Sequence, residues 1–264
     1  MRLFGRQRQS SAPVPVEISE KQGVRYLHLG GDAVQSAMRM RDPFALELEY
    51  TRAMFAALLF VPEVRAIGLI GLGGGSIAKY VHRRLPECRI EAVDIHAEVI
   101  AAARTWFMLP DNDERLDVRE ADGARWIESR PAAFDLLLVD GYDGRRIVEA
   151  LASPGFYAAC IAALRPGGCA VFNLWGSDRL FETYRQRIEA AFGHAPLLLP
   201  AEKKGNIQVF AFRPPWPGLE LDVLEDRAGA WQQRLGLEFT RFLARLVALN
   251  PVAAGAFELA PGEA

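Results

Sequence analysis

The stretch AIGLIGLGGGSIAKYVHRRL (Ala66–Leu85) decides the fold, because it holds a strand, a turn and a helix in direct succession. AIGLIGL is a short and almost wholly apolar run, which is typical of a buried β-strand, whereas SIAKYVHRRL predicts a helix. The glycines between them let the backbone approach a ligand closely, and the helix N-terminus supplies free N–H groups and a partial positive charge. Tight packing of a helix on a strand selects the same glycines, so the turn alone is only a candidate binding site.

The same alternation of strand and helix continues through the middle of the chain. Further strands are expected at residues 89–95, 116–122, 134–140 and 168–175, and helices at 97–109, 123–130, 154–165 and 179–192. Strands rich in Val, Ile and Leu that alternate with helices predict a doubly wound, mostly parallel α/β sheet covered on both faces. Two final strands, at 195–200 and 206–214, are joined by too few residues for a helical crossover, so we expect them to pair antiparallel.

Four segments are expected along the 264 residues. Residues 1–14 are interpreted as a flexible tail. Residues 15–60 hold a small N-terminal β segment and then a helix over Pro43–Phe60, with the proline in its first turn. Residues 61–213 form the main α/β domain. Residues 214–264 begin with the chain breaker PPWPG and continue as a C-terminal helical extension, a single helix or a helix pair.

Composition and charge exclude several classes of protein. The formal net charge of −2 leaves no basic footprint for nucleic acid, and no apolar run reaches the ~18 residues that suggest a membrane span. The three cysteines, Cys88, Cys160 and Cys169, lack the spacing of a metal or redox site, and the four histidines are scattered. We therefore expect no metal, no nucleic acid and no membrane, and a reducing compartment, the cytoplasm.

Acidic residues follow the next three predicted strands. Asp94 comes 21 residues after Gly73, where an acid can accept hydrogen bonds from both ribose hydroxyls. Asp122 ends a strand and precedes a helix, so it can accept the exocyclic amine of an adenine or simply cap the helix. Asp140 and Asp143 end the following strand. Because ligands of open α/β sheets bind at the carboxyl ends of strands, the series favours one site over separate caps.

Two classes of cofactor fit this series. GGGSIA (Gly73–Ala78) matches the G-x-G-x-x-G/A pattern of dinucleotide-binding turns. S-adenosylmethionine and its decarboxylated form also use a glycine loop and a ribose acid, and they add a polar residue after the third strand for the adenine. Asp122 and the antiparallel closing strands favour this adenosyl-sulfonium class. We therefore expect residues 61–213 to form a nucleoside-binding Rossmann-like domain of the S-adenosylmethionine-dependent methyltransferase type.

The order of several short motifs resembles the spermidine synthase (polyamine aminopropyltransferase) family over most of the chain. The motifs are, in chain order, VQ (Val34-Gln35), RDPF (Arg41–Phe44), Tyr50, GGGS, VDI, DGARW, VDGYDG, YAACIAALRPGG and GNIQVFAF. Each motif is modest by itself, and their order is what is specific. The chain is similar to a divergent member of this family.

The resemblance implies an activity and a set of site residues. Family members transfer the aminopropyl group of decarboxylated S-adenosylmethionine to putrescine and release methylthioadenosine. The residue matching Asp140 is the catalytic one and assists the attacking amine. The residues matching Asp143 and Tyr50 contact the small-molecule amine substrate, putrescine. The implied cofactor-binding residues are Gln35, Gly73, Gly74, Gly75, Asp94, Asp122 and Gly123. A homodimer is a further expectation.

The acid pair suits this chemistry on physical grounds. A sulfonium is already a good leaving group, so neither a metal nor an acid is needed to activate it. An alkylammonium has a pKa of ~10, as lysine does, and cannot attack while it is protonated. A carboxylate within hydrogen-bond reach, such as Asp140, can draw the diamine in and accept its proton. Two acids match a dication better than one.

Three departures from the family pattern replace an acid, and a fourth is Gly144 where the family has a proline after its second acid. Ser76 stands where typical members have an acid that takes the ammonium of the cofactor, Pro43 replaces a second acid, and Arg52 replaces an acidic substrate contact. The changes make the pocket less suited to a polycation and keep three functions open. These are aminopropyl transfer to putrescine or a related amine, methyl transfer from S-adenosylmethionine, and nucleoside binding without catalysis. A fourth function, that of an NAD(P)-dependent oxidoreductase, is not supported, because the sequence has no catalytic Tyr/Lys or His arrangement.

Overall fold

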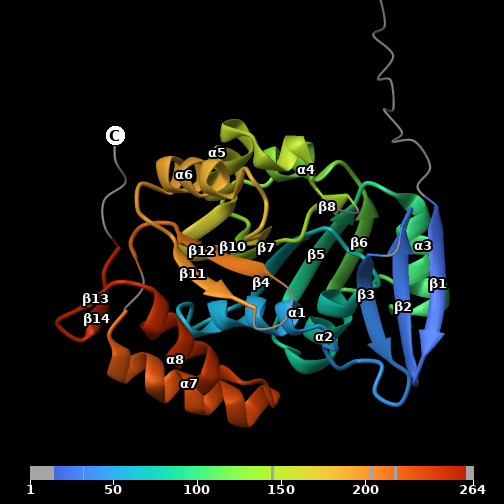
Figure 1. The fold of residues 1–264 in the computed structure, drawn as a ribbon, viewed down its shortest axis with the longest axis horizontal. Helices are drawn as coiled ribbons and strands as arrows, with labels where there is room; N and C mark the ends of the chain where they lie inside the picture. Colours follow the sequence, from blue (N-terminus) through green and yellow to red (C-terminus); the bar gives the residue numbers. More distant parts are fainter. Residues whose placement is uncertain (1–14, 32, 144–145, 202–204, 217–218, 260–264) are drawn as a thin grey trace, which may run out of the picture.

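The computed structural model describes residues 15–31, 33–143, 146–201, 205–216 and 219–259, so the tail expected at residues 1–14 lies outside the described residues. A seven-stranded sheet runs through the centre of the molecule (Figure 1). In spatial order its strands are β11 (Leu197–Pro200), β12 (Asn206–Phe212), β10 (Leu164–Trp175), β7 (Phe134–Val139), β4 (Ala66–Ile70), β5 (Arg89–Asp94) and β6 (Leu116–Glu120).

The direction of the strands confirms the expected α/β architecture. Strands β10, β7, β4, β5 and β6 pair in parallel, and β12 pairs antiparallel with both β10 and β11. The strand order reverses at β4, because the chain first moves outward through β5 to β6 and then returns to β7 on the other side. Ligands of open sheets bind at the carboxyl ends of strands beside such a switch point. The fold therefore predicts a site where β4, β5 and β7 end.

Helices cover both faces of the sheet (Figure 1). One face carries α4 (Gly123–Glu128), α5 (Pro154–Ala163) and α6 (Phe181–Phe192). The other face carries α1 (Glu49–Met54), α2 (Ser76–Arg84), α3 (Ala97–Trp106), α7 (Leu221–Leu235) and α8 (Phe239–Leu249). Successive residues of β7 alternate between the two cores, with Leu136 and Leu138 in one and Leu137 and Val139 in the other.

The N-terminal segment forms the expected small β structure. Strands β1 (Val16–Lys21), β2 (Val24–Leu29) and β3 (Val34–Arg39) pair antiparallel in chain order. Leu27 and Met38 of this sheet form a separate apolar cluster with Phe107, at the end of α3. The cluster holds β3 against the main domain, which brings Gln35 and Ser36 to the glycine loop.

The helix expected over Pro43–Phe60 is wrong in its first part. Residues 43–48 form a turn followed by bends and irregular backbone, α1 begins only at Glu49, and a 3-10 helix, η1 (Phe55–Leu59), follows it. The Nη1 group of Arg52 donates to the carbonyl oxygens of Leu46 (3.0 Å) and Glu47 (3.1 Å). These carbonyls therefore bond an arginine side chain and not the amides of a longer helix. Every side chain of η1 is buried. The apolar spacing of this stretch therefore predicted which side chains are buried, but not where the α-helix begins.

The C-terminal region is the expected helix pair. Helices α7 and α8 lie together below the sheet in Figure 1, and a short hairpin of β13 (Val252–Ala253) and β14 (Ala256–Phe257) follows. Phe239 and Leu246 belong to the same core as Phe60 of the main domain. Within the described residues, no helix has both the length and the apolar character needed to cross a bilayer.

Candidate functional site

The glycine loop begins where β4 passes between its two neighbours. Gly71 donates from its backbone N–H to the carbonyl of Val93 (2.9 Å), and Asp140 donates from its N–H to the carbonyl of Ile70 (2.8 Å). Gly71 has a φ of +89°, and a Cβ at this position would lie 2.0 Å from the carbonyl oxygen of Asp140. Glycine is therefore required here for both conformation and space. The loop and the Asp140 backbone are in direct contact.

The middle of the loop is packed against β3 and the end of α3. The hydroxyl of Ser36 accepts the N–H of Gly74 at 2.8 Å. A Cβ on Gly73 would lie 2.8 Å from Ser36 Oγ, and one on Gly74 would lie 2.9 Å from the ring of Phe107. Packing alone thus explains glycine at positions 73 and 74. This is one of the two explanations that the sequence allowed, the other being close approach to a ligand. Gly75, with a φ of +71°, is the N-cap of α2.

Asp94 is held at the end of β5 by backbone amides. Its carboxylate accepts the N–H of Leu72 at Oδ2 and the N–H of His96 at Oδ1, both at 3.0 Å. Burial raises the pKa of the Asp94 carboxyl, and these N–H groups oppose the rise. A carboxylate oxygen has more than one lone pair, so each oxygen can accept a further donor such as a ribose hydroxyl.

Asp122 is the N-cap of α4, as one of its two interpretations predicted. Its side chain accepts the N–H of Ala124 at 2.9 Å, and Arg125 lies 3.7 Å from its other oxygen. The carboxylate is half-exposed and faces the same rim as Asp94. Gly123 follows it, and a Cβ there would lie 2.4 Å from Cγ2 of Ile70. Asp122 therefore has a structural role that is compatible with contact to a ligand.

Asp140 has both carboxylate oxygens hydrogen-bonded to side chains. Tyr50 Oη donates to Oδ2 at 2.9 Å, and Asn173 Nδ2 donates to Oδ1 at 2.7 Å. Burial raises the pKa of the Asp140 carboxyl above its ordinary value, and the bonds from Asn173 and Tyr50 partly offset the rise. Burial beside this acid also raises the pKa of the Tyr50 phenol well above its usual range. Tyr50 therefore remains a donor at neutral pH.

One cavity gathers most of the residues that the sequence singled out. Its predicted members are Gln35, Gly73, Asp94, Asp122, Gly123 and Asp140. Apolar side chains complete the wall, among them Leu29, Ile95, Val99, Val148 and Leu151. Gly74 and Gly75 are not part of this lining. Gly74 donates to Ser36, and Gly75 is the N-cap of α2. A lining that combines acids and apolar groups can hold a polar sugar and a flat base together.

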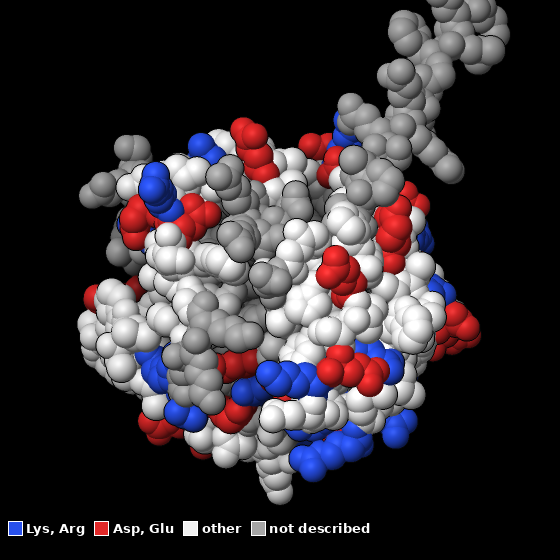
Figure 2. All heavy atoms as spheres, turned by 45° about the vertical axis from the view of Figure 1, so that its right-hand side comes forward, with Lys and Arg blue, Asp and Glu red and all other residues white. Residues whose placement is uncertain are grey.

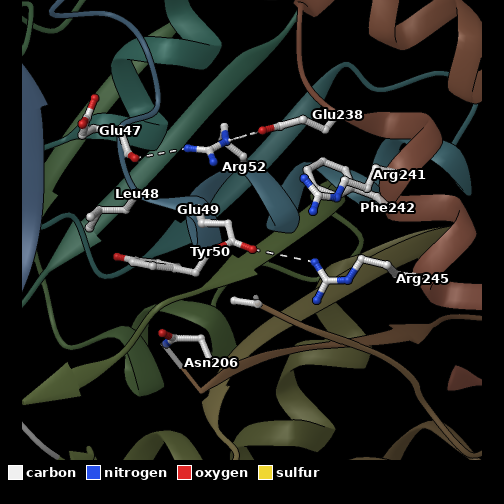
Figure 3. A pocket seen from close by; sticks show the side chains of 11 residues that line it. Glu47, Leu48, Glu49, Tyr50, Arg52, Asn206, Glu238, Arg241, Phe242 and Arg245 are labelled. Carbon is white, nitrogen blue, oxygen red and sulfur yellow. Dashed lines mark hydrogen bonds and ion pairs between the residues drawn. The ribbon is translucent and has the colours of Figure 1, made fainter. Parts of the chain in front are cut away.

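A second cavity, the charge-paired pocket, has Tyr50 in its lining (Figure 3). It is lined by Glu47, Leu48, Glu49, Tyr50, Arg52, Ala201, Asn206, Glu238, Arg241, Phe242 and Arg245. Its acids contact arginines: Glu238 accepts from Arg52 Nε at 3.1 Å, and Glu49 lies 3.7 Å from Arg245. In Figure 3, Arg52 lies between Glu47 and Glu238, and the Tyr50 hydroxyl points away from the arginines of α8. Acid and base therefore alternate around this pocket.

Asp143 is the predicted site residue that the structure leaves least defined. It belongs to β8 (Tyr142–Asp143), which pairs antiparallel with β9 (Arg146–Ile147), and a 3-10 helix, η2 (Glu149–Ala152), follows. Its side chain lies outside the described residues. Across the described residues of the face in Figure 2, acidic and basic side chains are interspersed and form no continuous basic patch.

Asn173 and Ser36 are site residues that were not predicted from the sequence. Asn173 interrupts the apolar run AVFNLW of β10, and a buried amide within a strand is a signal that could have been noticed. Nothing in the sequence marked Ser36 as the partner of the loop, since the two are joined only by the packing of β3.

Comparison with known proteins gives three results. The model of the spermine/spermidine synthase domain matches residues 48–197. A polyamine aminopropyltransferase of Chromobacterium violaceum is 40% identical over 240 residues, which cover 91% of this chain and 92% of that protein. The crystal structure of a probable spermidine synthase from Corynebacterium glutamicum has a TM-score of 0.68 at 21% identity, covering 95% of this chain and 94% of that one.

The fold is also shared with a protein of a different name. Human methyltransferase-like protein 13, solved in complex with SAH, has a TM-score of 0.63 and 25% identity, covering 78% of this chain and 95% of that one. The Rossmann-like fold of the methyltransferase type, which the sequence predicted, is therefore confirmed. Fold similarity of this kind does not separate methyl transfer from aminopropyl transfer.

Proposed function

This chain belongs to the spermine/spermidine synthase family, and on that premise we propose that it is an aminopropyltransferase that uses decarboxylated S-adenosylmethionine. The observation that carries the proposal is the single cavity where Asp94, Asp122 and Asp140 meet at the carboxyl ends of β5, β6 and β7, on either side of the glycine loop after β4. The 40% identical relative from Chromobacterium violaceum is named for the same transfer. The acceptor we propose is putrescine or a related small amine.

The nucleoside is proposed to lie along the rim of β4, β5 and β6. Asp94 accepts the ribose hydroxyls, and its own orientation is fixed by the amides of Leu72 and His96. Asp122 and Gly123 face the adenine, which packs against Ile95 and Val99. Gln35 closes the cavity from β3. In this arrangement the aminopropyl chain on the sulfonium sulfur points toward Asp140.

The transfer step needs a free amine and a positioned base. The amine nitrogen attacks the carbon of the aminopropyl group bonded to sulfur, the C–S bond breaks, and sulfur keeps the electron pair as a neutral thioether. The proton of the attacking amine passes to the Asp140 carboxylate. A base whose pKa lies above that of an ordinary aspartate accepts this proton more readily, and burial has that effect on Asp140. Tyr50 keeps the carboxylate in place.

The acceptor is proposed to reach Asp140 from the charge-paired pocket. The nucleoside fills the cavity that Asp140 lines, and two lining residues of the charge-paired pocket lead to Asp140 by hydrogen bonds. Tyr50 donates to Asp140 directly, whereas Asn206 donates to Asn173, which in turn donates to Asp140. An in-line displacement at carbon requires the amine to approach opposite the sulfur. Asp143, at the end of the same strand connection, stays a prediction as the second contact of the diamine.

Calorimetric titration of the full chain separates the candidate functions. Decarboxylated S-adenosylmethionine should bind more tightly than S-adenosylmethionine, because the carboxylate of the parent compound would approach the acids at the strand ends, Asp94 and Asp140. The reverse order of affinity would favour methyl transfer. If neither compound binds, the protein is a family member that does not catalyse this transfer. The variant Gly155→Ala, on the exposed start of α5, is the matched control and should bind as the wild type does.

The cellular setting and the oligomeric state remain predictions. Cys88, Cys160 and Cys169 are buried and not disulfide-bonded, which supports a reducing compartment, and we propose the cytoplasm. A homodimer is the expected assembly, and light scattering of the purified protein tests it.

A further inference from the structure

A buried amide in the centre of the sheet contacts the proposed base. Asn173 lies in β10, directly opposite Gln208 of β12. Its Oδ1 accepts one N–H from Gln208 at 2.9 Å and one from Asn206 at 3.0 Å. Two donors that converge on this oxygen fix which end of the amide it presents to them. The Nδ2 group therefore points at Asp140, where it donates to Oδ1 at 2.7 Å.

We propose that Asn173 is a positioning residue that keeps the Asp140 carboxylate ionised and directs the transferred proton to its Oδ2 atom. The inference deepens the proposed function and rests on it. Asn173 does not line either cavity and acts through Asp140, so it is not a catalytic residue itself. Gln208 and Asn206 support it from the neighbouring strand.

The direction of the proton follows from the donors around the carboxylate. An amide N–H can only donate, and a proton on Oδ1 would face it donor to donor. A hydroxyl such as that of Tyr50 can rotate and either donate or accept, so a proton on Oδ2 can be accommodated. Asn173 thereby disfavours the protonated acid at one oxygen and leaves the other available to the attacking amine.

Loss of the amide should change how activity depends on pH. A hydrogen bond to a charged group contributes about 1.5–3 kcal/mol, and about 1.4 kcal/mol corresponds to one pKa unit. In Asn173→Leu the pKa of Asp140 should therefore rise by about one to two units. The base is then protonated at higher pH than in the wild type. The acid limb of the kcat/KM profile for the amine should move upward by the same amount.

The matched variants separate positioning from stability. Asn250→Leu removes another buried amide, which links the end of α8 to Leu198 of β11 and makes no hydrogen bond to Asp140 or Asn173 among the described residues. It should lower the melting temperature and leave the pH profile unchanged. Gln208→Met removes one donor to Asn173, and since Gln208 Oε1 has no partner among the described residues, the replacement should be well tolerated. It should move the acid limb in the same direction as Asn173→Leu, but less.

The experiment measures the pH profile of the three variants and, in parallel, the titration of Asp140 by NMR of aspartate labelled at the carboxyl carbon. The NMR readout needs no substrate, so it tests the inference even if the wild type fails to transfer an aminopropyl group, which would overturn only the proposed function. An upward shift in Asn173→Leu, or in Gln208→Met should the first variant not fold, supports the inference. An unchanged titration of Asp140 in a folded variant would overturn it.

Discussion

At the scale of single residues, the proposed chemistry centres on the carboxylate of Asp140, which is partly buried and hydrogen-bonded on both oxygens. Replacement Asp140→Asn removes the proton acceptor and keeps the shape of the side chain. We expect turnover to fall by about 10²–10⁴-fold, the usual contribution of a general base. Affinity for decarboxylated S-adenosylmethionine, measured by calorimetry, should stay within a few-fold of the wild type. An Asp140→Asn enzyme of normal activity would remove Asp140 from the mechanism.

Asp94 supplies the complementary control. Asp94→Asn keeps a polar group at the end of β5 but loses the charge that favours two ribose donors. We expect the nucleoside affinity to weaken by more than tenfold, as loss of a charged hydrogen-bond partner implies. The maximal rate at saturating nucleoside should change much less. Equal affinity of Asp94→Asn and wild type would mean that Asp94 only ties the backbone of Leu72 and His96.

Lys79 is a buried cation behind the glycine loop. Its Nζ donates to the carbonyl of Phe107 at 2.6 Å, and burial lowers the pKa of the ammonium from 10.5 to about 8. Above about pH 8 the native state has released a proton that the unfolded state still holds up to about pH 10.5. The unfolded state binds more protons in this window, so stability should rise with pH there, by on the order of 1–3 kcal/mol.

Urea denaturation between pH 7 and pH 10.5 measures this effect. Lys79→Met should lose the rise in free energy of unfolding that the Lys79 ammonium causes. Lys21→Met, at an exposed end of β1, is the matched control and should retain it. If the wild type and Lys79→Met depend on pH in the same way, the Lys79 side chain is not desolvated in solution.

At the scale of elements, the β4–α2 turn depends on glycine for contact with β7. Gly71→Ala would place a methyl group 2.0 Å from the Asp140 carbonyl oxygen at a φ of +89°. We expect a loss of at least about 2 kcal/mol in the free energy of unfolding. Gly155→Ala, with nothing within 4 Å of the added Cβ, should be neutral or stabilising by about 0.5–1 kcal/mol. A Gly71→Ala protein as stable as the wild type would contradict this close approach.

The ion pair between α1 and the start of α8 sets the charge of the proposed acceptor pocket. Arg52 and Glu238 are both partly exposed, so their pair contributes little to stability. Arg52→Gln removes a cation and frees the Glu238 carboxylate for the incoming diamine. We expect the KM for putrescine to fall about two- to fivefold, the range of a modest electrostatic gain, with kcat unchanged. Arg104→Gln, in an exposed pair with Asp111, is the control. A raised KM for Arg52→Gln would place the acceptor elsewhere.

The elements also show where sequence reasoning ends. The alternation of strands and helices could be predicted from the sequence, because buried parallel strands need continuous apolar runs. The non-helical start at residues 43–48 could not be predicted from apolar periodicity, because that periodicity does not report the hydrogen bonds that the Arg52 side chain donates to the carbonyls of Leu46 and Glu47. Periodicity reports which side chains are buried, and η1 is as buried as any helix would be.

At the scale of the whole molecule, strand order converts a linear series of residues into a site. The carboxyl ends of β4, β5, β6 and β7 meet at one edge of the sheet, so Gly73, Asp94, Asp122 and Asp140 line one cavity. This much could be predicted from the sequence, because parallel topology follows from the pattern. The family resemblance read from the motifs is likewise confirmed.

The support around the acids could not be predicted. The bonds of Asp140 to Tyr50 and Asn173 join residues from α1, β7 and β10, which are distant in the chain. Likewise, the charge-paired pocket exists only because α8 packs beside α1 and brings Glu238 to Arg52. Such contacts depend on tertiary packing, and no local pattern of the sequence encodes them. The division into four segments at residues 14, 60 and 213 stays a prediction.

Product analysis of the wild-type enzyme tests the central claim most directly. The protein is incubated with putrescine and either decarboxylated S-adenosylmethionine or S-adenosylmethionine, and the nucleoside products are identified by mass spectrometry. We predict methylthioadenosine and an aminopropylated amine from the decarboxylated compound, with the yield of both about 10²–10⁴-fold lower for Asp140→Asn. Formation of S-adenosylhomocysteine from the parent compound, with no methylthioadenosine from the decarboxylated one, would contradict the account.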